Sequence, residues 1–188
     1  VCGAIQKEHD VTLRGVYSLL GCTKQNIAYW SANPHSTQSK GSVYAVLKRA
    51  EELFELSDVQ AEALANSAGL SLQFEGGDLI EALGYKGKMR ELCRKAMISE
   101  RMLRRYRHEI PAKQTIIAFA VVLGKSASDT DILLRKYGYC LSDSIIGDVV
   151  VKWYLTTEHS KMNEELLIFS INETLEKMGV PLLMTRQS

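Results

Sequence analysis

The sequence predicts an all-α protein with two similar helical domains in tandem and a C-terminal helical extension. Three observations support this fold class. Apolar residues recur at helical spacing along most of the chain, glycine and proline stand mainly between those segments, and one block of sequence repeats the pattern of another. With 188 residues, the chain is long enough for two small domains that each bury a core of their own.

An internal repeat defines the two domains. Residues 88–107 match residues 12–31 at a constant offset of 76, and residues 126–140 match residues 57–71 at an offset of 69. The first copy must therefore contain extra residues between its two matched blocks. We place them in the polar segment 31–41, because insertions collect in loops.

The first domain, residues 1–73, is expected to contain five helices. One lies at the N-terminus, and the others are expected at residues 12–20, 23–31, 42–56 and 58–67. Ser57 is suited to cap the last of them, and Gly69 to end it. The two successive glycines of segment 75–78 predict a linker to the second domain, because they lose too much backbone freedom inside a helix.

The second domain, residues 74–142, should repeat these helices. Ser99 and Ser126 stand at cap positions, and Pro111 stands where a fourth helix opens.

The C-terminal extension, residues 143–188, is expected to form helices near 143–155 and 163–178. Residues 149–151 are all valine, which favours a strand, but Ile146 and Trp153 around them keep helical spacing. The two helices have more apolar side chains than they can hide alone. We therefore expect them to pack on the second domain.

Composition argues against several classes of protein. No apolar run approaches the roughly 20 residues of a membrane span, and the N-terminus lacks a signal pattern, so we expect a cytoplasmic protein without a membrane partner. The four cysteines are scattered without paired spacing, which favours reduced thiols and no metal. The four histidines stand alone, and no phosphate loop or nucleophile motif is present. We expect neither a cofactor nor an enzyme.

Charge is distributed unevenly along the chain. Residues 86–107 contain nine basic residues against two acidic ones, whereas residues 51–81 contain eight acidic residues and no basic one. This pattern indicates either a face that meets phosphate or attraction between the two halves. A solvated, charged helix face is the remaining interpretation.

Residues 11–30 carry a family likeness. They read Val-Thr-Leu-Arg-Gly-Val-Tyr-Ser-Leu-Leu-Gly-Cys-Thr-Lys-Gln-Asn-Ile-Ala-Tyr-Trp. This segment resembles the helix-turn-helix of the lambda-repressor-like, or xenobiotic-response-element, family, with an apolar first helix, a glycine turn, and Thr23 followed by Ile27. The resemblance implies a bacterial or phage transcriptional regulator that binds double-stranded DNA. The second copy departs from the pattern, because Met97 stands where glycine normally makes the turn.

A second resemblance covers residues 74–183, which look like a helical module at the C-terminus of assorted bacterial proteins. The segments that carry it are residues 98–103, residues 136–142, and the ending from Ile171 to Leu183. It implies a fold and a bacterial or phage origin, and no activity.

The candidate DNA-binding residues follow from the needs of a recognition helix, which presents polar side chains from its first two turns to the major groove. Gln25 can pair with adenine, Lys24 suits guanine or phosphate, and Tyr29 can contact a thymine methyl or the backbone. The arginines of the second copy suit phosphate contacts better than base reading. The full set is Thr12, Thr23, Lys24, Gln25, Asn26, Ala28, Tyr29, Lys40, Ser99, Arg101, Arg104, Arg105 and Arg107.

An alternative function uses the same helices without DNA. Helix-turn-helix units also serve as scaffolds, and exposed aromatic residues such as Tyr29 mark protein interfaces. A helical adaptor that binds a protein partner is therefore the second hypothesis. A homodimer formed through the C-terminal extension is compatible with either function.

Overall fold

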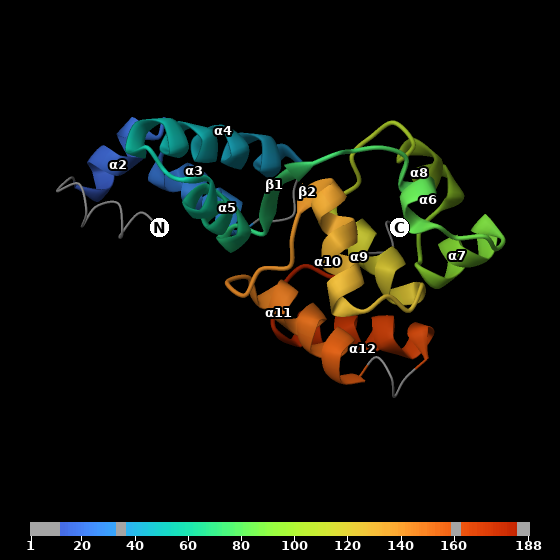
Figure 1. Ribbon diagram of the computed structural model, residues 1–188. Helices are drawn as coiled ribbons and strands as arrows, with labels where there is room; N and C mark the ends of the chain where they lie inside the picture. The colour runs from blue at the N-terminus through green and yellow to red at the C-terminus, as the bar shows by residue number, and fades with distance from the viewer. Residues whose placement is uncertain (1–11, 33–36, 159–162, 184–188) are drawn as a thin grey trace. The chain divides into compact units, whose positions relative to one another are not determined.

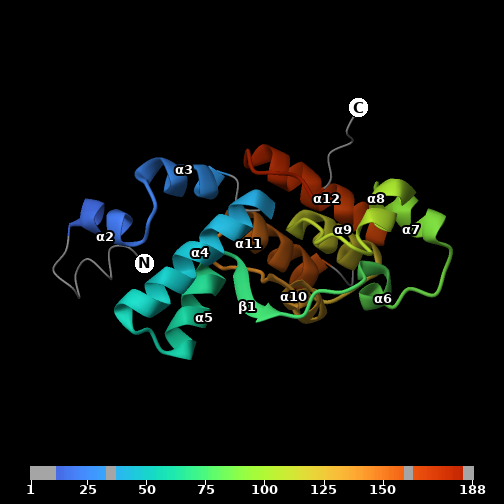
Figure 2. The same ribbon diagram turned by 90° about the horizontal axis from the view of Figure 1, so that it is seen from above.

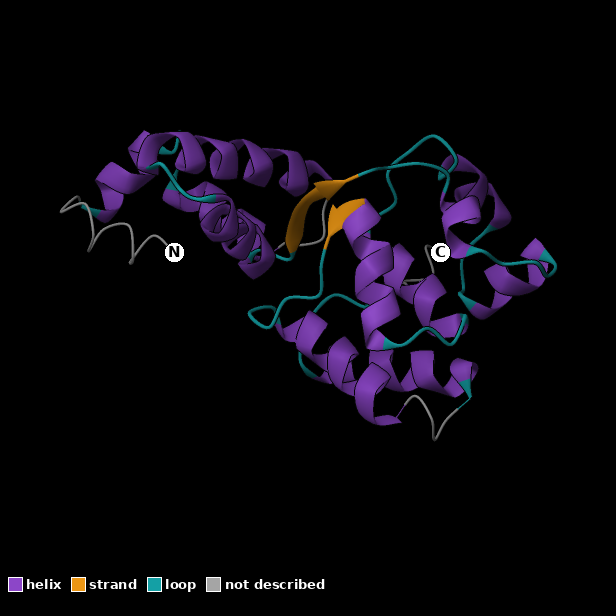
Figure 3. Ribbon diagram, in the orientation of Figure 1, coloured by secondary structure: helices purple, strands orange, loops and turns teal. Residues whose placement is uncertain are grey.

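The computed structural model describes residues 12–32, 37–158 and 163–183 (Figure 1). The chain divides into two compact units, Val1–Ala68 and Gly69–Ser188. Most of the described residues lie in helices, as Figure 3 shows. The helix expected at the N-terminus falls outside the described residues.

The first unit is built from helices. They are α2 (Leu13–Leu19), α3 (Lys24–Ala32), α4 (Thr37–Phe54) and α5 (Asp58–Ser67). Its core consists of the buried residues Val16, Leu20, Cys22 and Ala50, against which half-buried side chains of α3, α4 and α5 pack, among them Ile27, Val46 and Leu64. Ser57 caps α5 through a full capping box with Gln60, as its position in the sequence indicates.

Helix α4 begins earlier than expected. It starts at Thr37, whereas the sequence placed a loop over residues 31–41. The polar residues that suggest a loop are also compatible with an exposed helix, and Gly41 is accommodated inside α4 with open space around it. A single glycine in a helix costs only about 1 kcal/mol, which the rest of a long helix offsets.

The second unit contains both strands and the remaining helices. In order along the chain these are β1 (Leu70–Phe74), α6 (Leu79–Leu83), α7 (Met89–Lys95), α8 (Glu100–Arg105), α9 (Lys113–Val122), α10 (Ala127–Lys136), β2 (Tyr137–Tyr139), α11 (Ile146–Trp153), the π-helix η1 (Tyr154–Glu158) and α12 (Glu164–Lys177). Residues 149–151 belong to α11, so the helix expected there is confirmed.

The all-α prediction needs one correction. Strands β1 and β2 form a two-stranded antiparallel sheet, with Leu70 opposite Tyr139. The sequence Leu-Ser-Leu-Gln-Phe of β1 alternates apolar and polar residues, the period of a strand. Because its pairing partner lies in the second unit, β1 belongs there too. The two compact units divide between Ala68 and Gly69, a few residues before segment 75–78.

Helix α9 lies at the centre of the second unit. All of its residues except Gln114 are buried, and it packs against α7, α10 and α12. Figures 1 and 2 show α12 alongside α9. The apolar face of α12, with Leu167, Ile171 and Leu175, is buried there. The C-terminal helices thus complete the core of the second unit.

Candidate nucleic-acid interface

Both copies of the repeat contain the same local arrangement of two helices and a turn. In the first unit, α2 ends before Gly21, which has a φ of 67°, and α3 follows. In the second unit, α7 ends before Met97, which has a φ of 54°, and α8 follows. Left-handed φ values are common for glycine and unusual for methionine. Met97 nevertheless adopts the same left-handed conformation as Gly21, so the backbone of the turn is the same in both copies.

The hydrogen bonds of the two turns are also equivalent. The N–H of Cys22 donates to the carbonyl of Tyr17 at 2.9 Å, and the N–H of Ile98 donates to the carbonyl of Cys93 at 2.9 Å. These pairs are related by the offset of 76 that aligns the two copies in sequence. The buried positions correspond as well, since Cys22 is 8% exposed and Ile98 is 5% exposed. Each turn thus has the same backbone hydrogen bond and is followed by a buried apolar side chain.

Thr23 and Asn26 fix the beginning of α3. The Asn26 Oδ1 atom accepts from the backbone N–H of Thr23 at 2.8 Å and from its hydroxyl at 2.7 Å. In return the N–H of Asn26 donates to Thr23 Oγ1 at 3.1 Å. This reciprocal arrangement satisfies helix-end groups in the manner of a capping box. Both residues were candidates for DNA contact, and their oxygen atoms are used within the protein to cap α3.

The remaining candidates on α3 share an exposed face. Lys24, Gln25, Ala28 and Tyr29 are all exposed, with Tyr29 50% exposed. Ile27 points the other way and packs on the core of the unit. The first two turns of α3 therefore present a cation, an amide and a phenol to solvent, which are groups that can contact base edges and phosphate.

Two further candidates for DNA contact, Thr12 and Ser99, cap helices, and a third, Lys40, has a side chain that the structure does not describe. Thr12 caps α2, because its Oγ1 accepts from the N–H of Gly15 at 3.1 Å. Ser99 caps α8 in the same way, accepting from Met102 at 3.2 Å. Lys40 belongs to α4, but its side chain lies outside what the structure describes, so its role stays a prediction.

Three of the arginines in α8 and after it, Arg104, Arg105 and Arg107, are engaged in ion pairs. Arg104 pairs with Glu100 at 3.4 Å, and Arg105 pairs with Glu109 at 2.7 Å. The hydrogen bond from Arg105 holds the pKa of Glu109 below its usual range. Arg107 pairs with Asp78 at 3.8 Å, with both side chains at least one third exposed.

Several basic residues of segment 86–107 are therefore already paired with carboxylates, and fewer of them are available to phosphate than their number suggests. Exposed ion pairs contribute little to stability because water and salt screen them, so a phosphate can replace the carboxylate at little cost. The basic residues of this block that have no acidic partner among the described residues are Lys86, Lys88, Arg90, Lys95 and Arg101. Of the four arginines proposed for phosphate contact, only Arg101 belongs to this group.

Arg49 contributes to the first turn, which sequence reasoning did not predict. Its Nε atom donates to the carbonyl of Leu19, the last residue of α2, at 2.6 Å. The side chain passes near Gly21, since a Cβ built on that glycine would lie 4.0 Å from Arg49 Cδ. The bond joins residues 30 positions apart, and no local pattern predicts a contact of that kind.

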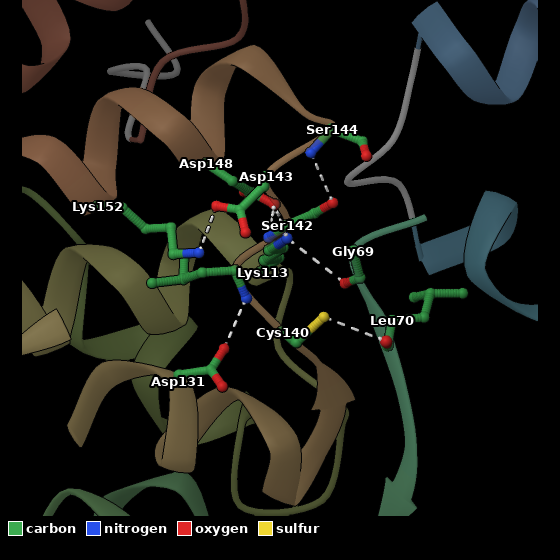
Figure 4. A network of polar contacts seen from close by, with 11 residues as sticks. Gly69, Leu70, Lys113, Asp131, Cys140, Ser142, Asp143, Ser144, Asp148 and Lys152 are labelled. Atoms are coloured by element: carbon green, nitrogen blue, oxygen red, sulfur yellow. Dashed lines mark hydrogen bonds and ion pairs between the residues drawn. The ribbon is translucent and has the colours of Figure 1, made fainter. Parts of the chain in front are cut away.

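A buried polar network lies at the start of β1, away from both turns in sequence (Figure 4). Lys113 Nζ and Asp148 Oδ2 are 2.5 Å apart, and each side chain is 1% exposed. Lys113 also donates to the carbonyl of Gly69 at 3.4 Å, and Asp148 accepts from the N–H of Ser142 at 2.9 Å. The network therefore ties α9 and α11 to Gly69, the residue before β1.

Burial is the largest influence on the pKa of the carboxyl group in this network. It raises the pKa of Asp148, although the ammonium of Lys113 acts in the opposite direction. Asp148 Oδ1 is buried without a hydrogen-bond partner among the described residues. Burial also raises the pKa of the nearby Cys140 thiol to about 11. A thiol that stays protonated at neutral pH is a poor nucleophile, and we assign this cluster to stability.

The chain matches no family model, no curated protein and no solved structure. The resemblance to the lambda-repressor-like family therefore rests on the residues that carry it. Within the described ranges, no helix is both long and apolar enough to cross a membrane, and no three His, Cys, Asp or Glu side chains are placed to hold a metal ion.

Proposed function

We propose that the protein is a sequence-specific, double-stranded DNA-binding regulator of transcription, of bacterial or phage type, located in the cytoplasm. Helix α3 reads bases in the major groove, and the second copy adds phosphate contacts. The observation that carries this proposal is the exposed face of α3, where Lys24, Gln25 and Tyr29 follow a capped and closed turn. Recognition helices need polar side chains on a rigid support in this position.

The second copy supports the proposal through its charge. The turn at Met97 reproduces that at Gly21, and α8 presents exposed arginines. Glu100 is the residue of α8 that could accept from a base edge, but it pairs with Arg104. We therefore assign the exposed arginines of α8 to the DNA backbone and not to base reading. Phosphate contacts strengthen binding to all sequences alike and make the affinity dependent on salt.

A selection from random duplexes tests this function. The full chain is incubated with a randomised pool of duplexes at low salt, and bound DNA is recovered by mobility shift and sequenced over several rounds. The proposal predicts enrichment of one motif and a steep loss of affinity with added salt. Failure to retain duplex DNA at low salt would contradict it.

A second candidate function is an adaptor that binds protein without DNA. The observation that favours it is an exposed apolar stripe on α11, formed by Ile146, Val149 and Trp153, which are 60%, 44% and 52% exposed. Stripes of this kind mark protein contacts, including homodimers. Under this alternative, Trp153→Glu abolishes self-association or partner binding in light scattering, and duplex selection yields nothing.

A further inference from the structure

Arg49 combines two properties that single it out on the surface of the first unit. Its Nε atom is held by the carbonyl of Leu19 at 2.6 Å, while the side chain as a whole is exposed. Its two terminal nitrogens have no partner among the described residues. Glu52, one helical turn further along α4, stands at ion-pair spacing but does not pair with it.

The bond to Leu19 completes the end of α2. The last carbonyls of a helix lack partners within the helix. The turn itself supplies donors to Val16, Tyr17 and Ser18, through the N–H groups of the three residues that follow Leu19. The remaining carbonyl, that of Leu19, accepts from Arg49. The guanidinium of α4 is thus bonded to the end of α2, just before the turn that leads into α3.

The second copy has no counterpart to this bond. Lys95 occupies the position equivalent to Leu19, and no side chain in the described part of the second unit donates to its carbonyl. The difference follows the division of roles proposed above, in which the first copy reads bases and requires the more precisely held helix.

We propose that Arg49 is a preorganised phosphate clamp, whose Nε holds the turn before α3 while its terminal nitrogens bind one phosphate of the DNA backbone beside that turn. This inference rests on the proposed function. A planar guanidinium can hold a phosphate through two parallel hydrogen bonds, which an ammonium cannot do. Fixing Nε in advance removes side-chain freedom that binding would otherwise have to remove.

Two variants and a matched control test the clamp. Arg49→Gln removes the charge and the fork, and Arg49→Lys retains only the charge. Lys48→Gln removes the same charge from the neighbouring exposed position on α4. We measure the affinity of each full-length variant for a duplex of fixed sequence over a series of salt concentrations. Amide hydrogen exchange is measured at Gly21 and Cys22.

The clamp predicts that Arg49→Gln weakens binding roughly tenfold, the equivalent of one charge-assisted hydrogen bond, and lowers the salt slope by about one. Arg49→Lys keeps the salt slope of wild type but binds as weakly as Arg49→Gln. Both Arg49 variants speed amide exchange at Gly21 and Cys22. Lys48→Gln changes neither the affinity and its salt slope nor the exchange at the turn to this extent. If wild type binds and Arg49→Gln behaves like Lys48→Gln, the clamp is wrong and the proposed function stands. If wild type binds no duplex, both are wrong.

Discussion

Gly21 and Met97 occupy equivalent positions of the repeat and share a left-handed backbone, with φ values of 67° and 54°. A methionine in this conformation crowds its own Cβ against the neighbouring carbonyl, at a cost of roughly 1–2 kcal/mol. The turn is therefore imposed by the packing of α7 and α8 rather than by the residue at its centre. The second copy preserves the geometry of the first without the residue that normally makes it.

The first prediction compares two truncations of Met97. Met97→Gly and Met97→Ala remove nearly the same side-chain contacts, but only glycine adopts a positive φ without strain. We expect Met97→Gly to have the higher free energy of unfolding, by about 1 kcal/mol. Urea denaturation of the two variants measures the difference. An alanine variant as stable as the glycine variant would show that the left-handed turn is not maintained in solution.

The second prediction concerns Gly69, which has a φ of 71°. A Cβ at this position would lie 2.7 Å from Ile145 Cδ1 and 2.8 Å from Lys113 Nζ. Gly69→Ala combines backbone strain with a clash against the buried ion pair. We expect its free energy of unfolding, measured by urea denaturation, to fall by more than about 2 kcal/mol. Gly84→Ala is the control, because Gly84 has a similar φ of 63° with open space around it. It should cost only about 1 kcal/mol.

The third prediction separates the two partners of the buried ion pair. Lys113→Met leaves the carboxylate of Asp148 buried and uncompensated, and Asp148→Leu does the same to the ammonium. Each single variant should lose about 3–5 kcal/mol in free energy of unfolding. The double variant should recover most of that loss, because neither charge then remains. Losses that simply add would contradict a direct interaction between the two side chains.

The fourth prediction is a pH dependence that follows from the raised pKa of Asp148. Between the ordinary pKa of an aspartic acid, about 3.9, and the raised value, the folded state binds more protons than the unfolded state. Stability must therefore fall as pH rises through this window, and remain level above it. Urea unfolding of wild type minus that of the Lys113→Met/Asp148→Leu variant, measured from pH 3.5 to 7, isolates this contribution. A difference that rises with pH would reverse the assignment.

Periodicity and caps predicted most of the helical structure. Ser57, Ser99 and Ser126 all cap helices as expected, because an N-cap is a local interaction that sequence spacing reveals. The strands were missed because β1 is short and its partner β2 lies far away in sequence. Pairing between distant segments leaves only the weak alternation of Leu70–Phe74 as a local signal.

The candidate site was predicted only in part, for a similar reason. Helical spacing placed Lys24, Gln25 and Tyr29 on an exposed face, and the structure places them there. Sequence could not show that Asn26 caps α3, that acidic residues pair with Arg104 and Arg105, or that Arg49 reaches Leu19. Those contacts depend on side-chain geometry and on tertiary packing.

The central claim is that α3 reads bases, and the fifth prediction tests it by repeating the duplex selection with two variants. Gln25→Ala should lose the preference at one base pair and weaken binding to the selected site by roughly 1–3 kcal/mol. Arg101→Ala should keep the same motif, weaken all sequences alike and lower the salt slope by about one. Identical motifs for wild type and Gln25→Ala, with only a uniform loss of affinity in both variants, would contradict base reading by α3.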